Sequence, residues 1–93
     1  MAAVRVVIYP LKGSIDEVVK RAQETLVPIY RDHDGFQSLS VVQDADRIIS
    51  ITHWDSHDHA EQGGKAALEW VGQHADLIGD PIDRHIGDEV MSA

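Results

Sequence analysis

Histidines are the side chains of this sequence best suited to acid–base or metal chemistry, because imidazole titrates near neutral pH and ligates metal ions. The chain has six of them and no cysteine, which excludes disulfides, thiolate metal sites and a cysteine nucleophile. The densest group is His57-Asp58-His59. Residues two apart on a helix point about 200° apart and cannot share a tetrahedral ion. Because Asp55-Ser56 predicts a helix start, we expect solvated first-turn histidines and no metal site.

His74 is the first choice for a catalytic base. A second helix is predicted from Asp55-Ser56 to about His74, with an interruption at Gly63-Gly64. Residues that recur at helical spacing give it one stripe, which consists of Ala60, Gly64, Ala67, Val71, His74 and Ala75. Such small residues either pack very closely on a sheet or leave a hollow. In a hollow, His74 is the polar group of an apolar pocket, and in close packing it is a buried or edge histidine.

Two aromatic residues could complete such a pocket. Trp54 stands where the third predicted strand meets the second helix, and it is either a core anchor or a pocket wall. Tyr9, on the first strand, could offer its hydroxyl to a ligand or to a surface partner. We therefore predict His74 as the catalytic residue and a substrate-binding set made of Tyr9, Trp54, Gly64, Ala67 and Val71.

Length and charge limit the classes of function. A chain of 93 residues makes one domain, 1–93, and its formal net charge is −8. Residues 1–43 carry five acids and five bases, whereas residues 44–93 carry eleven acids and three bases. Such a surface repels phosphate backbones and anionic headgroups, so we expect neither nucleic-acid nor membrane binding. The longest apolar run near the N-terminus, Val6 to Tyr9, is too short for a signal peptide or a membrane span, which favours the cytoplasm.

The predicted elements alternate in a recognisable order. A Ser14-Ile15-Asp16-Glu17 capping box starts the first helix, and Pro28 should kink or end it. Strands are predicted over residues 4–9, 36–43, 47–54 and 82–91. The order strand, helix, strand, strand, helix, strand predicts a ferredoxin-like βαββαβ α+β fold. Right-handed crossovers put both helices on one face of a four-stranded antiparallel sheet.

The strands are apolar on both faces, although two helices can cover only one. In the first strand, alternation puts Val4, Val6 and Ile8 on one face and Val7 and Tyr9 on the other. In the third strand it separates Ile49 and Ile51 from Ile48 and Trp54. In the second strand the same alternation opposes Leu39 and Val41 to Phe36 and Val42. A second copy of the chain, packed sheet to sheet, would cover the remaining face. We therefore expect a homodimer.

The layout resembles the dimeric α/β barrel superfamily and, within it, the antibiotic biosynthesis monooxygenase-like group. The residues that carry the resemblance are Gly35-Phe36, the run Ile51-Thr52-His53-Trp54-Asp55-Ser56 that leads into the second helix, and Gly79-Asp80-Pro81-Ile82. The resemblance implies a ligand site between helix and sheet. It also implies a histidine near the end of the second helix, about where His74 falls, in the heme-degrading members.

Those heme-degrading members also carry a tryptophan midway along that helix and an asparagine in strand one. This sequence has Gln62 and Gly63 at the first place and no asparagine at all. We therefore expect no heme and no other cofactor. The resemblance implies a cofactor-independent monooxygenase that acts on a small aromatic or polyketide-like substrate. A non-catalytic ligand-binding or stress-related barrel protein and a bare dimerisation module stay open as alternatives, with a small apolar ligand as the partner in the first of these.

Overall fold

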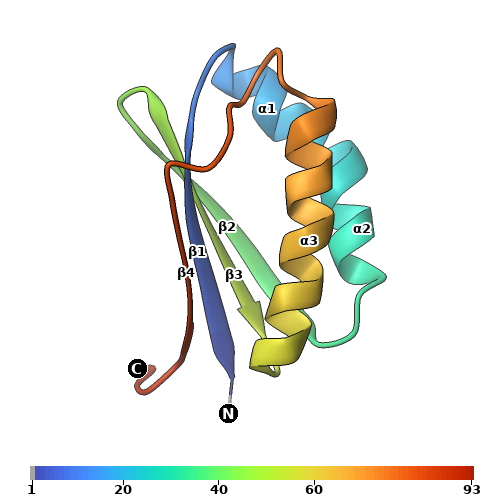
Figure 1. The fold of residues 1–93 in the computed structure, drawn as a ribbon, viewed down its shortest axis with the longest axis vertical. Coiled ribbons are helices and arrows are strands. Elements are labelled where there is room, and N and C mark those ends of the chain that lie inside the picture. Colours follow the sequence, from blue (N-terminus) through green and yellow to red (C-terminus); the bar gives the residue numbers. More distant parts are fainter. Residues whose placement is uncertain (1) are drawn as a thin grey trace.

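The computed structural model describes residues 2–93 and has one sheet with all its helices on one face (Figure 1). The elements are β1 (Ala3–Pro10), α1 (Ile15–Arg21), the π-helix η1 (Ala22–Leu26), α2 (Val27–Arg31), β2 (Phe36–Asp44), β3 (Arg47–Trp54), α3 (His57–Gln73) and β4 (Asp83–Asp88). The antiparallel strands lie in the order β2-β3-β1-β4. This is the ferredoxin-like α+β fold that the sequence predicts. None of the helices within residues 2–93 has the length and apolarity to cross a membrane.

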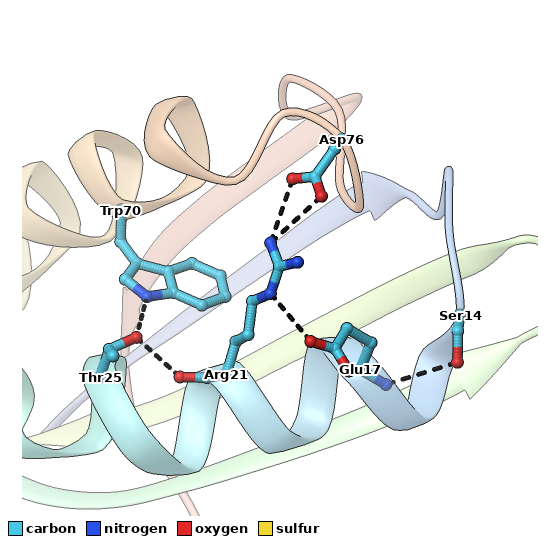
Figure 2. Close-up of polar contacts among 6 residues, drawn as sticks. All are labelled: Ser14, Glu17, Arg21, Thr25, Trp70 and Asp76. Atoms are coloured by element: carbon cyan, nitrogen blue, oxygen red, sulfur yellow. Dashed lines mark hydrogen bonds and ion pairs between the residues drawn. The ribbon is translucent and has the colours of Figure 1, made fainter.

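The first helix is continuous through α1, η1 and α2. Ser14 caps it as predicted, since its hydroxyl accepts a hydrogen bond of 3.4 Å from the backbone N–H of Glu17 (Figure 2). Pro28 neither ends nor breaks it, because the π-helical turn η1 directly before this proline changes the hydrogen-bond register. The Thr25 hydroxyl donates to the backbone oxygen of Arg21 at 2.7 Å within this turn. The helix therefore reaches Arg31.

Burial alternates along the two central strands. In β1 the residues from Ala3 to Tyr9 at odd positions are buried under the helices, whereas Val4, Val6 and Ile8 are half-buried on the other face. In β3 the same division separates Ile48 and Trp54 from Ile49 and Ile51. We call the face without helices the open face.

Phe36 departs from the predicted alternation in β2. The strand register shifts between Phe36 and Ser38, so that Phe36 pairs with Trp54 while Val42 pairs with Ile49. The prediction that Phe36 shares a face with Val42 is therefore wrong. An extra residue in a strand reverses the side-chain alternation beyond it. Phe36 stacks on Tyr30 of α2 at a centroid distance of 5.3 Å and completes the aromatic end of the core.

The fourth strand is shorter than predicted, whereas the second helix keeps its predicted ends. The fourth strand, expected over residues 82–91, is Asp83–Asp88 only, and Val90 and Met91 beyond it are exposed. The second helix begins where Ser56 predicts, because its hydroxyl accepts from the backbone N–H of His59. The predicted interruption at Gly63-Gly64 is wrong, because the helix continues through both glycines, which pack on the sheet, and ends at His74. Helix α3 lies against β1, β3 and β4.

Candidate functional site

Helix α3 lies unusually close to the sheet at two consecutive glycines. A methyl group built on Gly63 would overlap the indole ring of Trp54, and one built on Gly64 would lie 2.7 Å from Nε of Arg5. Only glycine allows this approach without moving a neighbour. Helix α3 therefore packs directly on β3 at Gly63 and on β1 at Gly64, and Gly64 belongs to the small-residue stripe predicted from the sequence.

The enclosed space between helices and sheet is small. One cavity of about 30 Å³ remains there, with Tyr9, Ala67 and Val71 among the residues that line it. A cavity of this volume holds about one or two water molecules. Three of the five substrate-binding residues predicted from the sequence thus come together around a space far smaller than an aromatic molecule.

A larger cleft opens beside α3, where the helix faces β1 and β4. Its volume is about 560 Å³, which lies in the range typical of small-molecule sites. It is lined by Arg5, His57, Glu61, Gly64, Lys65, Leu68, Arg84, His85 and Ile86. Gly64 is the one residue of the predicted substrate-binding set that borders this cleft. His85 borders it from the strand edge, but its register with Val6 puts it on the open face.

The cleft carries positive charge on an acidic protein. Arg5, Lys65 and Arg84 are three of the eight Lys and Arg side chains of the chain. The one carboxylate among the lining residues belongs to Glu61, whose Oε1 lies 3.2 Å from Nε2 of His57. The local field therefore favours anions, whereas the net charge of −8 repels them at long range.

Arg5 is the most unusual residue of the cleft, because it is only 3% exposed. Among residues 2–93, no Asp or Glu forms a salt bridge with it. Three buried side-chain atoms in this described part of the chain have no hydrogen-bond partner: Nη1 of Arg5, Oγ1 of Thr52 and Nε1 of Trp54. Arg5 and Thr52 are direct cross-strand neighbours, and Trp54 is the next residue of β3 on the same face. We call these three residues the Arg5 cluster.

Tyr30 lies beside this cluster and stays neutral. Burial raises the pKa of its hydroxyl to about 12, and the nearby positive charge of Arg5 offsets part of that effect. Its ring packs edge-on against Trp54 at a centroid distance of 5.6 Å. The hydrogen bond with Arg5 also lowers the pKa of Tyr30, but a neutral phenol carries no negative charge to balance the guanidinium.

The structure places His74 away from both spaces. It is half-buried at the end of α3, where its Nδ1 donates 2.7 Å to the backbone oxygen of Trp70, and its ring stacks on the Trp70 indole at 4.2 Å. This bond fixes the tautomer and leaves Nε2 as the basic nitrogen. His74 lines neither the cleft nor the small cavity. Trp54 is a fully buried core residue whose ring lies under Gly63.

The remaining histidines lie apart from one another. His57 and His59 occupy the first turn of α3 as predicted, where each pairs with a carboxylate four residues away, Glu61 and Asp55. His53 and His85 project from the open face on different strands. Within residues 2–93, no three His, Asp or Glu side chains gather closely enough to hold a metal ion.

A second groove of about 610 Å³ runs between the first helix and the edge strand β2. Its lining includes Val19, Val27, Leu39 and Val41, with Arg31 as the one Lys or Arg. None of the Arg5 cluster borders it. The cleft beside α3 is therefore the better candidate site.

Comparison with known families decides the assignment. Residues 1–63 match the family model of the antibiotic biosynthesis monooxygenases, which is more than half of the chain. The chain belongs to this family. No curated protein matches the sequence.

Solved structures of antibiotic biosynthesis monooxygenases and similar proteins share the fold. SnoaB, a cofactor-independent oxygenase from Streptomyces nogalater, matches with a TM-score of 0.75 and 11% identity, over 98% of this chain and 95% of SnoaB. A protein from Nitrosomonas europaea that carries the family name matches with a TM-score of 0.71 and 19% identity, over 96% of this chain and 90% of that protein. Rv0793 from Mycobacterium tuberculosis matches with a TM-score of 0.72 and 11% identity, over 100% of this chain and 99% of Rv0793. At these identities the likeness establishes the fold alone.

Arg5 is the site residue that sequence reasoning missed. The signal was present, because Arg5 has the same parity along β1 as Val7 and Tyr9, which both point under the helices. The β-branched run around Arg5 predicts a strand, but it does not mark Arg5 as a functional residue. Its lack of a partner could not be read from the sequence, since that depends on which residues of α3 and β3 lie against it.

Proposed function

We propose that this member of the antibiotic biosynthesis monooxygenase family is a cofactor-independent monooxygenase that acts on a small aromatic or polyketide-like substrate in the cleft beside α3. The family match over residues 1–63 carries the proposal. The cleft supports it with a suitable volume and with apolar walls from Leu68 and Ile86. The cavity of about 30 Å³ is too small for such a substrate unless α3 moves.

The proposed reaction needs no bound cofactor, because the substrate itself reduces oxygen. A base removes a proton from an activated CH₂ group, and the resulting carbanion or enolate passes electrons to O₂. One oxygen atom forms a new carbonyl on that carbon, and the other leaves as water with the two hydrogens. The protein would supply the base, positioning and exclusion of water.

Two histidines are proposed as this base. His74 has a fixed tautomer with Nε2 available to accept a proton, although a substrate must reach it beyond the cleft. His57 borders the cleft directly and lies 3.2 Å from Glu61. His33 offers a matched control, because its Nδ1 donates to a backbone oxygen at the end of α2 in the same way, at 2.8 Å.

Oxygen uptake tests the activity. Purified protein without added metal, flavin or heme is mixed with a panel of dihydroxyanthracene-like compounds, and quinone formation is followed by its absorbance. We expect one O₂ consumed per quinone formed, a loss of about 100-fold in kcat for whichever of His57→Ala and His74→Ala removes the base, and little change for His33→Ala. Unchanged rates in both variants would remove these histidines from the mechanism. Saturable binding without uptake would favour the alternative of a non-catalytic ligand-binding protein.

We also propose that the open face pairs with a second copy of the chain. Val4, Val6, Ile8, Ile49 and Ile51 form a contiguous apolar surface across β1 and β3. Each of them is only half-buried in the single chain, and a sheet partner would remove the rest of this surface from water.

Sedimentation equilibrium at micromolar concentration tests the pairing. We expect twice the chain mass of 10.3 kDa. Ile51→Asp, in the middle of the open face, should shift the protein to the single-chain mass. Gln62→Asp adds the same charge on exposed α3 and should leave the mass unchanged. A single-chain mass for the unmodified protein would refute the pairing.

A further inference from the structure

We infer that Arg5, the member of the Arg5 cluster that lines the cleft, binds the anionic oxygen of an aromatic ligand, a carboxylate or an ionised phenol, while Thr52 and Trp54 lie buried behind it. The ligand class follows from the atoms on offer. Arg5 and Trp54 present N–H donors, and Thr52 presents a hydroxyl that can donate. Of these groups, Arg5 is the one that borders the cleft, so a ligand there meets a donor that needs an acceptor, and a negatively charged acceptor also neutralises the guanidinium.

Burial makes this cluster unusual. A guanidinium that is 3% exposed has lost most of its hydration, and none of the described residues returns it through a salt bridge. A buried charge without a partner destabilises the folded protein, and an anionic ligand that pairs with it would remove this destabilisation. The unpaired guanidinium of Arg5 borders the cleft, where a ligand could reach it.

The charges around the cleft support an anion independently of the cluster. Lys65 and Arg84 flank the opening, and they are two of the three basic residues in the acidic second half of the chain. Glu61, the one acid of the lining, is paired with His57. Cations gathered in a cleft attract anions to it even when the net charge of the protein is negative.

The walls of the cleft indicate that the anion belongs to a ring system. Leu68 of α3 and Ile86 of β4 face the cleft, and Gly64 leaves the helix side without a side chain above Arg5. Apolar walls with a few convergent polar atoms are typical of sites for aromatic ligands. A free inorganic anion would gain nothing from these walls.

The inference deepens the proposed function by naming the charged group of the substrate, but its test does not depend on oxygen chemistry. 2-Naphthoate carries a carboxylate on an aromatic ring and has no CH₂ group to oxidise. 2-Naphthamide has nearly the same shape and no charge. Binding of the first can therefore succeed when oxygenase activity fails.

The two indole N–H groups of the chain provide the readout, because Trp54 and Trp70 are its two tryptophans. In ¹H–¹⁵N spectra we expect naphthoate to shift the Trp54 indole signal saturably. The Trp70 signal should stay in place, since this indole already donates to Oγ1 of Thr25 at 2.7 Å. Naphthamide should bind at least about tenfold more weakly, because it lacks the charge that strengthens hydrogen bonds from a guanidinium.

Variants separate the Arg5 cluster from general charge effects. Arg5→Met should weaken naphthoate binding at least about tenfold and leave naphthamide binding almost unchanged. Arg47→Met removes the same charge from the exposed start of β3 and should leave both affinities within about twofold. If Arg5→Met fails to fold, the naphthoate and naphthamide titrations of the unmodified protein decide by themselves.

Three results would overturn the inference: equal binding of naphthoate and naphthamide, unchanged naphthoate affinity in Arg5→Met, or a naphthoate titration that moves Trp70 and leaves Trp54 unmoved. A different pattern would overturn it while preserving the proposed function. This is oxygenation of an uncharged substrate at the same rate by the unmodified protein and by Arg5→Met.

Discussion

The same three residue types, arginine, threonine and tryptophan, occur together in two regions of this molecule. Between the helices, Nε of Arg21 donates to Glu17 at 3.1 Å and its Nη1 to Asp76 at 3.2 Å (Figure 2). The indole N–H of Trp70 donates to the Thr25 hydroxyl at 2.7 Å. These polar groups are used within the protein and connect the first helix to α3 and to the segment after it.

The Arg5 cluster repeats these residue types on the sheet side, under the glycines of α3. The atoms named for it find no partner in residues 2–93. The difference lies in position, because Arg21 stands where acidic residues of two elements can reach it, and Arg5 stands under Gly64. The comparison teaches that the helix side pairs its polar groups within the protein, whereas the sheet side leaves three of its buried polar atoms without a partner in the described residues.

The largest expected effect tests the close approach that creates this difference. Gly63→Ala should destabilise the protein by about 3 kcal/mol, because the new methyl group overlaps the buried Trp54 ring. Gly72→Ala in the same helix meets nothing within 4 Å and should stabilise by up to about 1 kcal/mol. Urea unfolding measures both. Equal effects at the two glycines would mean that α3 does not depend on this contact.

The next effect compares the two arginines directly. Arg5→Met should stabilise the ligand-free protein by about 2 kcal/mol, since it removes a buried charge that lacks a partner. Arg21→Met should slightly lower stability, and this loss should shrink in high salt, because its partners are partly exposed. Thermal unfolding at low and high salt checks both. Destabilisation by Arg5→Met would show that Arg5 serves the fold.

The two threonines give a smaller and sharper contrast. Thr25→Val leaves the indole N–H of Trp70, a residue only 3% exposed, without its acceptor and should cost about 1 kcal/mol. Thr52→Val replaces a buried hydroxyl of the Arg5 cluster by a methyl group of the same size and should be neutral or stabilising. Chemical denaturation resolves the two. A similar cost at both positions would end the distinction between the regions.

The smallest effect depends on pH and concerns Asp55, which follows Trp54 and pairs with His59. The hydrogen bond between them lowers the pKa of Asp55 from 3.8 and raises that of His59 from 6.5. The lowered pKa of Asp55 stabilises the fold above pH 3.8, and this stabilisation is lost as the pH falls through the pKa of Asp55 in the folded protein. The raised pKa of His59 stabilises the fold below pH 6.5, and this stabilisation is lost as the pH rises through the pKa of His59 in the folded protein.

The stability difference between the unmodified protein and Asp55→Asn should therefore be largest near pH 5 and small at pH 9. Thermal unfolding across this range measures it. A difference that grows from pH 5 to pH 9 would contradict the sign of the His59 shift.

Local patterns accounted for most of the fold. The capping serines, the hairpin and the parity of β1 and β3 depend on residues within a few positions of one another. The predictions that were wrong concern positions where contacts with distant residues override the local pattern. The bulge that turned Phe36 inward leaves no mark in the alternation of β2, and Pro28 was accommodated by a π-helical turn.

The sequence by itself determined the order of elements, the two apolar faces of the sheet and the small-residue stripe of α3. Tertiary structure alone decided how far α3 descends onto the sheet, because this distance depends on all the side chains between them. At Gly63 and Gly64 the descent closes the interior to about 30 Å³ and leaves the cleft beside the helix as the main open volume near Arg5. The sequence singled out His74 and the stripe, whereas the packed structure also brings forward Arg5, since only packing shows which buried groups lack a partner.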